Sequence, residues 1–547
     1  MSDSKLLRGT ALLTGATFLS RLLGLLYVIP FTAIVGQAGN AIYGYGFIPY
    51  SVMLSLATLG IPMAVSKFVS KYRAAGDYKT GYRLLKSGML FMFVNGFIAF
   101  LILYISAPII SNWVINEPSE LEGYTIDDIV FTIRMVSIAL LIVPVMAIIR
   151  GYFQGHQSMG PTAVSQVIEQ IFRIAFILFS TVVIFNIMGG ELGTAVGIAT
   201  LGAFVGALGG MAVLLFYWLK RRSFIMKEVR ESTVTHSISL TDMYKEVIGY
   251  ALPISFVGLA IPFFQLIDMF TVSNALTQSG FMSQDEADTF FAIFTQTAHK
   301  VILIPMTLAT AFSITLIPTI TKSFVTGDQS ALQEQITKTF KIILFFTIPA
   351  VVGLSALSYP AFGTLFKLDD IDMGGMVLRY YAPIALFFAL FSISCAILQG
   401  LNKQKYSVLA LICGLLVKVS LNYILLYHFG SLGGILATYV GFGVAVVITL
   451  SAIGKFANYQ YSQLINQTRL ILLFVGIMGL YVVVASSYFQ QLFPLETWMN
   501  TVIVLIVGVS VGGITYLLLS LRFGLVQQIL GDRYKNRLIK KNKQIEG

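Results

Sequence analysis

Residues 84–108 read LLKSGMLFMFVNGFIAFLILYISAP, an apolar run whose one charged side chain, Lys86, lies near its start. A helix of roughly 20 residues crosses the hydrocarbon core of a bilayer, which is about 30 Å thick. The run is therefore long enough to span a membrane as a helix. It lacks the strict alternation of apolar and polar residues, over about 10 residues, that is typical of a strand in a membrane β-barrel.

Similar apolar runs recur along the whole chain, with short polar gaps between them. Of the 547 residues, 56% are hydrophobic and 11% are charged, and the mean hydropathy is +0.82. No water-soluble domain needs so apolar a surface. We therefore predict an all-α polytopic membrane protein of about 14 transmembrane helices. The expected spans are residues 10–35, 43–69, 84–108, 129–152, 161–186, 193–219, 246–273, 290–320, 340–362, 375–399, 405–428, 432–454, 468–489 and 498–521.

The charges alternate between successive gaps as the positive-inside rule requires. If the N-terminus is cytoplasmic, the inside segments hold most of the 36 lysines and arginines, including Lys220 to Arg230 and the tail from Arg533. The outside loops hold one basic residue, Lys367, and many acidic ones. Those acidic residues lie at 117–128, 285–288 and 369–372. We predict that both termini are cytoplasmic, and that the net charge of +11 serves contact with membrane lipids rather than nucleic acid.

Motifs for catalysis or for metal binding are not found. The chain contains no Walker loop, no HExxH sequence and no CxxC pair. Both cysteines, Cys395 and Cys413, fall inside predicted spans and away from any histidine cluster. We expect no catalytic residue, no cofactor and no metal site, and hence a transporter rather than an enzyme.

An internal repeat is visible in the polar segments that follow the helices. The segment Lys71–Asp77 after the second span matches Lys322–Asp328 after the eighth, with an offset of 251 residues. The segment Tyr152–Gly155 after the fourth span matches Ile397–Gly400 after the tenth, with an offset of 245 residues. Because order and direction are the same in both halves, we predict parallel repeats with a substrate path between two lobes.

The longest internal polar stretch, residues 220–245, divides the first twelve spans into six and six. We predict an N-terminal lobe at residues 1–235 and a C-terminal lobe at residues 236–455. Residues 456–547 then hold helices 13 and 14 and a basic cytoplasmic tail.

Ionisable side chains inside the spans are costly in lipid and therefore mark candidate sites. The residues near mid-depth are the cations Arg21, Arg173, Lys300 and Lys418 and the acids Glu169 and Asp268. Arg134, Arg150 and Arg379 lie closer to span ends, where arginine can snorkel. Glu169 and Arg173 share a helix face at i and i+4, as a structural ion pair or as part of a binding site. His299, beside Lys300, is either a hydrogen-bonded packing residue or a further donor. The excess of cations suits an anionic headgroup, whether phosphate, pyrophosphate or carboxylate.

Two segments resemble a known family of exporters. Residues 150–173 read RGYFQGHQSMGPTAVSQVIEQIFR and residues 20–24 read SRLLG. These segments resemble the MviN/MurJ-like and stage V sporulation protein B-like transporters of the multidrug/oligosaccharidyl-lipid/polysaccharide exporter superfamily. The resemblance extends loosely across the whole chain. It implies two six-helix lobes in a V around a central cavity, with helices 13 and 14 forming a lipid-facing groove.

The same resemblance implies the cargo and the residues that bind it. The expected function is a flippase in the cytoplasmic membrane of a bacterium, which exports an anionic undecaprenyl-pyrophosphate-linked oligosaccharide, typically the peptidoglycan precursor lipid II, by alternating access. The expected partners are this lipid, the membrane lipids and the cell-wall synthesis machinery. Arg21 and Lys300 fall on cationic positions of the family, whereas Tyr27 and Met53 stand where the family has two further arginines. Arg173 is the candidate replacement.

Some members of the family bind sodium through polar residues of helices 7, 11 and 12. That set corresponds here to Asp268, Lys418, Asn422 and Thr438, which we expect to serve coupling or gating. Because Lys418 places an ammonium where a cation ligand would be, we predict an interaction of Lys418 with Asp268 in place of a sodium site. Coupling to protons or to the membrane potential stays open.

Two other functions also stay open. One is a cation-coupled antiporter of drugs or other small molecules from the same superfamily, which would favour unpaired acids and aromatic residues in its cavity. The other is a membrane scaffold in cell-wall or spore assembly, which should tolerate the change Arg21→Ala.

Overall fold

A computed structural model describes residues 3–58, 60–115, 123–232, 234, 239–366 and 368–530. Within these ranges every regular element is a helix, and no strand is present. Three features of the predicted charge pattern lie outside the described residues. They are the acidic residues Glu117, Glu120 and Glu122, the lysine Lys367 and the basic tail from Arg533.

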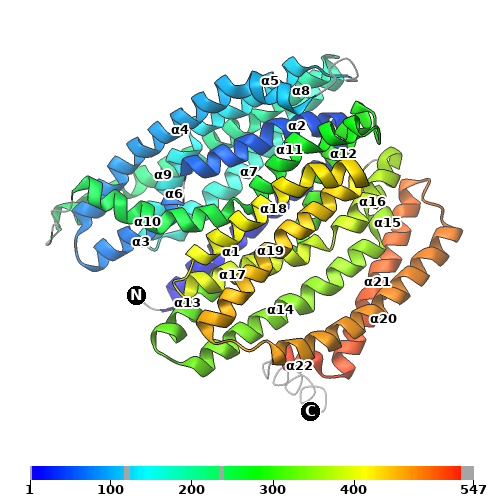
Figure 1. Ribbon diagram of the computed structural model, residues 1–547. Helices are drawn as coiled ribbons and strands as arrows, with labels where there is room; N and C mark the ends of the chain where they lie inside the picture. The colour runs from blue at the N-terminus through cyan, green and yellow to red at the C-terminus, as the bar shows by residue number, and fades with distance from the viewer. Residues whose placement is uncertain are drawn as a thin grey trace, which may run out of the picture. The chain divides into compact units, whose positions relative to one another are not determined.

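The helices pack into two compact units, which we call unit 1 and unit 2. Unit 1 comprises Met1–Thr297 and Asn422–Gly430, and unit 2 comprises Ala298–Leu421 and Ser431–Gly547. The helices of unit 1 are α1 (Asp3–Leu26), α2 (Val28–Thr58), α3 (Ile61–Ala74), α4 (Tyr78–Val114), α5 (Ile126–Ser137), η2 (Ile138–Leu141), α6 (Val143–Gly155), α7 (Met159–Thr181), η3 (Val182–Ile187), α8 (Leu192–Thr200), α9 (Gly202–Arg230), α10 (Leu240–Gly258), α11 (Ala260–Gln278), α12 (Gln284–Ala292) and η4 (Ile293–Thr297) (Figure 1). The helices of unit 2 are α13 (Ala298–Val325), α14 (Gln329–Ala356), α15 (Ser358–Leu365), η5 (Leu368–Asp370), α16 (Ile371–Tyr381), α17 (Ile384–Gly400), α18 (Lys405–Phe429, whose last turns belong to unit 1), α19 (Ser431–Ala457), α20 (Ser462–Leu492), α21 (Trp498–Arg522) and α22 (Leu525–Leu530). The lobe boundaries expected from the sequence stay a prediction.

Long apolar helices account for most of the predicted spans. Ten segments of the described residues could cross a membrane, or eleven if the bent pair α16 and α17 forms one span. The first of them, Leu12–Ala74, contains the two predicted spans 10–35 and 43–69. The predicted spans 246–273 and 290–320 are not among these segments, and each is interrupted, at Leu259 and at η4 respectively. The all-helical membrane architecture is confirmed, whereas the count of 14 is not.

The predicted repeat is visible in the turns that follow α3 and α13. In each turn a glycine with positive φ, Gly76 at 76° or Gly327 at 71°, precedes an aspartate. Glycine tolerates this conformation because it lacks a Cβ atom. The side chains of Asp77 and Asp328 then cap α4 and α14, each accepting a hydrogen bond at 3.0 Å from the amide three residues later. The two halves therefore share the same helix-turn-helix chemistry.

A second matched pair of contacts supports the same conclusion. A Cβ atom on Gly155, at the end of α6, would lie 2.7 Å from the Cβ atom of Val69 on α3. A Cβ atom on Gly400, at the end of α17, would lie 2.8 Å from the Cβ atom of Ile320 on α13. Both glycines are followed two positions later by a residue with φ of 56°. Each unit thus contains the same close contact, formed by residues at matching positions of the repeat.

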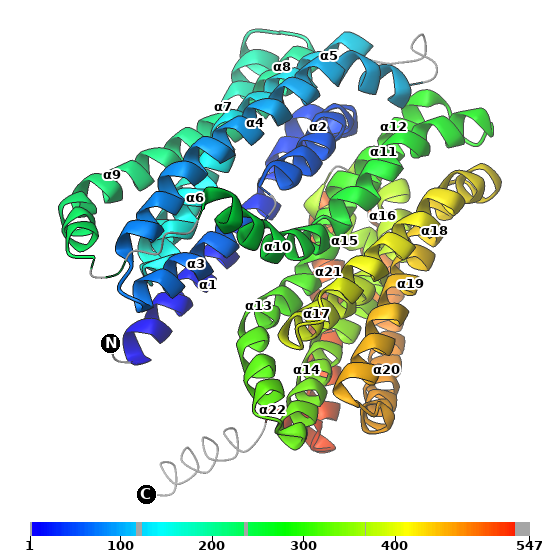
Figure 2. The ribbon, with the colours of Figure 1, turned by 60° about the vertical axis from the view of Figure 1, so that its left-hand side comes forward.

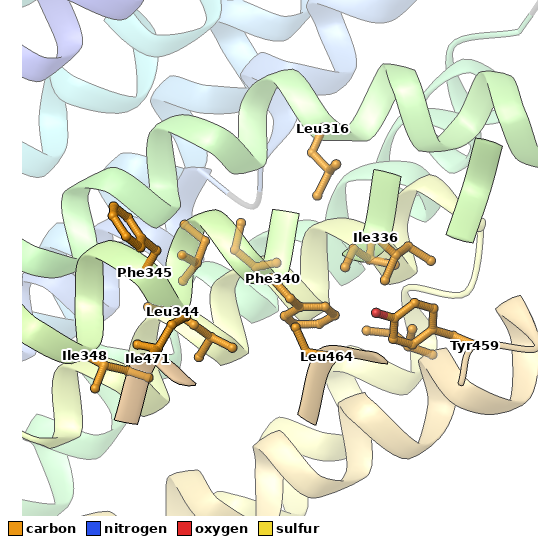
Figure 3. Packing of buried hydrophobic residues seen from close by; sticks show 14 of the residues in the cluster. Leu316, Ile336, Phe340, Leu344, Phe345, Ile348, Tyr459, Leu464 and Ile471 are labelled. Atoms are coloured by element: carbon orange, nitrogen blue, oxygen red, sulfur yellow. The ribbon is translucent and has the colours of Figure 1, made fainter. Parts of the chain in front are cut away.

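One face of α14 forms much of the apolar core of unit 2. Ile336, Phe340, Leu344 and Ile348 recur at steps of four residues and are all buried (Figure 3). This spacing places them on one side of the helix. They pack against α20, where Ile471 belongs to the same cluster. In unit 2, α20 runs beside α21 as an antiparallel pair (Figure 1).

Close packing of α9 on α7 fixes the position of α7 in unit 1. Gly202, Gly206 and Gly210 recur at steps of four on α9, the small-residue spacing that lets membrane helices approach closely. A Cβ atom on Gly206 would lie 2.6 Å from the backbone oxygen of Glu169, and one on Gly202 would lie 3.0 Å from that of Arg173. The glycines of α9 therefore pack directly against the backbone of α7 at its two ionisable residues, Glu169 and Arg173.

On the other side of unit 1, α11 runs beside α2 and leads into α12 (Figures 1 and 2). The helix α2 is kinked at Gly36, where φ is 67°. The backbone is not helical at this kink, which coincides with the end of the first predicted span, so two helical parts of α2 meet at the predicted boundary.

Candidate functional site

The packing of α1 on α7 brings Arg21 to the helix that carries Glu169 and Arg173. The hydroxyl of Thr17 donates to Oε1 of Gln166 at 3.1 Å. A Cβ atom on Gly24 would lie 3.0 Å from Nε2 of Gln170, so Gly24 permits a close approach. Arg21 lies between these two contacts along α1 and is exposed.

The side chain of Arg21 has no ion-pair or hydrogen-bond partner within the part of the chain that the structure describes. A charged group inside a membrane span is expensive unless water or an anion meets it. Arg21 is thus the kind of residue that can receive a charged ligand.

Glu169 forms its ion pair with Arg150 rather than with Arg173. Nη2 of Arg150 lies 2.8 Å from Oε2 of Glu169, and Nε of Arg150 donates to the hydroxyl of Ser165 at 2.8 Å. The two charged side chains are 14% and 19% exposed. From the sequence, Arg150 could snorkel, and Glu169 and Arg173 could form an ion pair or part of a binding site. In the structure the ion pair of Glu169 is with Arg150, because the packing of α6 on α7 supplies this guanidinium.

Arg173 lies among aromatic side chains of the first two helices. The guanidinium carbon is 5.3 Å from the centroid of the Phe47 ring, within cation–π range. Tyr27, Tyr43 and Tyr50 are close enough to interact with it electrostatically, and the hydroxyl of Tyr27 donates to that of Tyr43 at 3.1 Å. Nε of Arg173 is buried without a hydrogen-bond acceptor among the described residues. The cation is therefore surrounded by aromatic groups, and the carboxylate that also acts on it electrostatically, Glu169, is paired with Arg150.

These contacts leave unit 1 with a positively charged site. Three guanidinium groups, those of Arg21, Arg150 and Arg173, stand against the single carboxylate of Glu169. Tyr27, which occupies the place of an expected arginine, lies next to Arg173. This placement supports the prediction that α7 supplies the charge that α1 lacks.

The aromatic residues of this site were missed in the sequence. Tyr43, Phe47 and Tyr50 are spaced at i, i+4 and i+7, which is one face of a helix. That pattern is the signal that could have found them, but in an apolar span it is also typical of ordinary packing.

His299 and Lys300 both lie in unit 2, at the start of α13. Nδ1 of His299 is 3.0 Å from the hydroxyl of Tyr381, and its ring is buried against Tyr381 and Phe388. These contacts are those of a packing histidine that joins α13 to α16 and α17. Lys300 is partly buried. A role for either residue in a cavity stays a prediction.

The four residues expected to serve coupling form two hydrogen-bonded pairs. In unit 2, Lys418 is 0% exposed, and its Nζ donates to the hydroxyl of Thr438 at 2.7 Å. In unit 1, Nδ2 of Asn422 donates to Oδ1 of Asp268 at 3.1 Å and to the hydroxyl of Thr271 at 2.7 Å. The predicted interaction of Lys418 with Asp268 stays a prediction.

Helices α14, α15, α20 and α21 line an open apolar cavity of about 330 Å³ in unit 2. Glycines at positions 353, 508, 512 and 513 line it together with Pro349 and Tyr516. Because glycine has no side chain, the helices leave space here while they stay in contact elsewhere. Part of the cavity lining comes from α20 and α21, the pair of helices for which the family resemblance implies a lipid-facing groove.

Solved structures of other proteins share this fold. One is the lipid II flippase MurJ in an inward closed conformation, with a TM-score of 0.67 and 17% identity over 95% of this chain and 100% of that chain. Another is an inward-facing multidrug resistance MATE family transporter of the MOP superfamily, with a TM-score of 0.63 and 16% identity over 80% of this chain and 95% of that chain. The fold is that of these polytopic membrane proteins, which confirms the predicted all-α fold class.

Sequence comparison places the chain more closely. The family profile described as polysaccharide biosynthesis protein matches residues 6–324. The lipid II flippase MurJ of Bacillus subtilis (strain 168) is 44% identical over 536 residues, which cover 97% of this chain and 98% of that protein. The chain belongs to the polysaccharide biosynthesis protein family as a MurJ-like member.

Proposed function

We propose that this chain is a flippase that moves lipid II across the cytoplasmic membrane of a bacterium by alternating access. The observation that carries this proposal is the 44% identity to a lipid II flippase over 97% of the chain. A transporter, rather than an enzyme, follows from the same relationship. The chemistry of unit 1 supports the choice of cargo.

A pyrophosphate group suits the site on α1, α6 and α7. Guanidinium groups bind phosphate oxygens through paired N–H donors, and these bonds are stronger than those between neutral groups. Arg21 is exposed, and Arg173 retains a donor with no acceptor in the described structure. Because Arg150 engages Glu169, the carboxylate is prevented from repelling the phosphate. The hydroxyls of the neighbouring tyrosines add neutral donors.

The apolar cavity of unit 2 suits the lipid portion of the same cargo. Its lining by Pro349, Met478, Tyr516 and glycines offers no charged side chain. A polyprenyl tail seated there would stay in an apolar environment while the headgroup crosses. The two sites thus correspond in chemistry to the two parts of a lipid-linked oligosaccharide.

The orientation and the partners belong to the same proposal. We expect both termini to lie in the cytoplasm, as the distribution of basic residues indicates. Lipid II delivered to the outer leaflet must be consumed by enzymes that polymerise it, so the cell-wall synthesis machinery is the expected partner.

Complementation tests the proposal. A strain depleted of its lipid II flippase is supplied with the wild-type chain, Arg21→Ala, Arg173→Ala or Lys300→Ala, and exported lipid II is measured directly. Arg222→Ala, an exposed cation on α9, is the matched control. We expect export by the wild type and the control, and loss of export by Arg21→Ala and Arg173→Ala; loss by Lys300→Ala would extend the binding role to unit 2.

Normal export by well-expressed Arg21→Ala and Arg173→Ala would contradict the cationic mechanism. Growth rescue without any export of lipid II would favour the scaffold. The antiporter would be favoured if the chain exported small molecules driven by a cation gradient and exported no lipid II.

A further inference from the structure

An aromatic strip on α4 leads to a cation of α5. Phe93, Phe97, Phe100 and Tyr104 recur at steps of three or four residues and therefore share one face of α4. The centroids of successive rings along this strip lie 5.4 to 6.4 Å apart. Phe93 is 50% exposed, Phe97 43% and Tyr104 36%. The guanidinium carbon of Arg134 lies 4.9 Å from the centroid of the Tyr104 ring, so the strip ends at a cation.

The charge of Arg134 is not neutralised by an acid within the residues that the structure describes. Its Nε atom is buried and has no hydrogen-bond acceptor among them. A cation inside a membrane span is costly unless it is paired or reaches the headgroup region. Arg134 lies five residues into the predicted span 129–152, about 8 Å along the helix axis, and helical side chains point back toward the N-terminus. Its guanidinium can therefore meet a lipid headgroup.

The surface next to Arg134 stays apolar toward the middle of the membrane. Ile138, Ile142 and Val145 follow Arg134 at steps of three or four residues, and all are partly exposed. These residues lie on α5, η2 and α6, which run antiparallel to α4 and pack against it (Figure 1). One charge at the end of an apolar surface is the arrangement that suits a lipid, with a headgroup at one end and a hydrocarbon chain behind it.

The length and the charge of this surface indicate which lipid it suits. The 11 residues from Phe93 to Tyr104 rise by about 17 Å, close to half of a hydrocarbon core of about 30 Å. The strip thus matches the acyl chain of a lipid in one leaflet. A single guanidinium balances the single negative charge of a phosphodiester and can donate two hydrogen bonds to its oxygens.

We propose that Arg134 and the aromatic strip of α4 bind an anionic phospholipid, whose phosphate contacts the guanidinium and whose acyl chain lies along Phe93–Tyr104. The lipid belongs to the leaflet on the side where α4 ends and α5 begins. In the orientation expected from the loop charges, this is the outer leaflet. The proposal does not depend on the proposed function, because it concerns a lipid that is bound rather than moved.

Fluorescence quenching tests the proposal on the full-length chain in lipid vesicles. Phe97→Trp places a tryptophan in the strip, and the signal of the chain without this change is subtracted. Quenching is measured with phosphatidylglycerol or with phosphatidylcholine, each brominated in its acyl chains, which gives the relative binding of the two lipids at this position. We expect about fivefold stronger binding of phosphatidylglycerol, the preference that one arginine near a membrane surface gives for anionic lipid.

Three further variants locate the preference. Adding Arg134→Gln to Phe97→Trp should make the binding of the two lipids equal. Adding Arg222→Gln instead removes an exposed arginine of α9 and should leave the preference unchanged. Phe179→Trp, at a residue of α7 that is 70% exposed, should bind the two lipids equally. If Arg134→Gln does not fold, the comparison of positions 97 and 179 decides alone.

Equal binding of the two lipids at position 97 would overturn the proposal, as would the same preference at position 179. A preference that survives Arg134→Gln would overturn it as well. The surface would belong to the cargo instead if lipid II, added at one molecule per protein, abolished the preference for phosphatidylglycerol.

Discussion

At the scale of single residues, the site of unit 1 depends on which guanidinium neutralises Glu169. Arg150 does so from α6, and Arg173 is left among aromatic rings. This division of roles separates a structural cation from one that can receive a ligand. A buried ion pair is costly to break from one side, because the remaining charge is left uncompensated.

We therefore expect Arg150→Met to destabilise the protein by about 3 kcal/mol, because it leaves the Glu169 charge unpaired. The double variant Arg150→Met/Glu169→Gln should recover most of that stability, since no charge then remains. Thermal unfolding of the purified protein in detergent measures both, with Arg222→Ala as the control. Equal destabilisation by the single and double variants would show that Arg150 acts through packing rather than charge.

The sequence was informative about ionisable residues and uninformative about their partners. It identified Arg21, Glu169 and Arg173 because charges inside apolar spans stand out. It could not identify Arg150 as the partner of Glu169, since that contact depends on how α6 packs against α7. It placed Asp288 in an outside loop but could not show that this residue is buried, because its partner Tyr45 lies 243 residues away along the chain.

At the scale of the helix, the short polar segments between the apolar runs predict the turns of the structure well. The two glycine-aspartate turns were predicted as a repeat, and both form the same capped helix start. Such turns are local, so the residues that form them are adjacent in the chain. The close packing of α9 on α7 depends instead on glycines that face a distant helix.

Gly206→Ala should destabilise unit 1, because the added Cβ atom would lie 2.6 Å from the backbone oxygen of Glu169. Gly160→Ala on α7 is the control, since a Cβ atom there meets nothing within 4 Å. We expect the melting temperature of Gly206→Ala to fall by several degrees, and lipid II export to fall with it because α7 shifts. Equal melting temperatures for the two variants would contradict this account of the helix contact.

The cap of α14 should depend on pH. The amide of Ala331 and the hydroxyl of Ser330 donate to Asp328 and lower the pKa of its carboxyl below the ordinary value of 3.8. Because the folded pKa is the lower one, the cap contributes fully above pH 3.8 and is lost as pH falls through the folded pKa. Exchange of the first-turn amides should therefore accelerate at acid pH in the wild type and be fast at all pH values in Asp328→Ala. Asp77→Ala is the matched change on α4. If the first-turn amides of α14 exchange at the same rate in Asp328→Ala as in the wild type, the capping role of Asp328 is contradicted.

At the scale of the whole molecule, the functional conclusion depends more on family membership than on the geometry of the site. Composition and charge distribution predicted a helical membrane transporter, and the chain belongs to such a family. They could not distinguish phosphate from carboxylate as the anionic group, because arginine binds both. They also could not fix the number of spans, since helices can end inside an apolar run, as α10 does at Gly258.

Transport should not depend on sodium. Lys418 places a buried ammonium, bonded to Thr438, where the resemblance implies a cation ligand. We expect lipid II export to be unchanged when potassium replaces sodium at constant ionic strength and membrane potential. Strong dependence on sodium would contradict this interpretation of Lys418.

Reconstitution tests the central claim most directly. The purified chain is placed in vesicles that contain lipid II, and the fraction of lipid II reaching the opposite leaflet is measured by its accessibility to an impermeant probe. The account predicts movement by the wild type and by Arg222→Ala, and movement at the level of protein-free vesicles for Arg173→Ala. Movement by Arg173→Ala at the wild-type rate would contradict the cationic site, and a wild type no faster than protein-free vesicles would contradict the flippase itself.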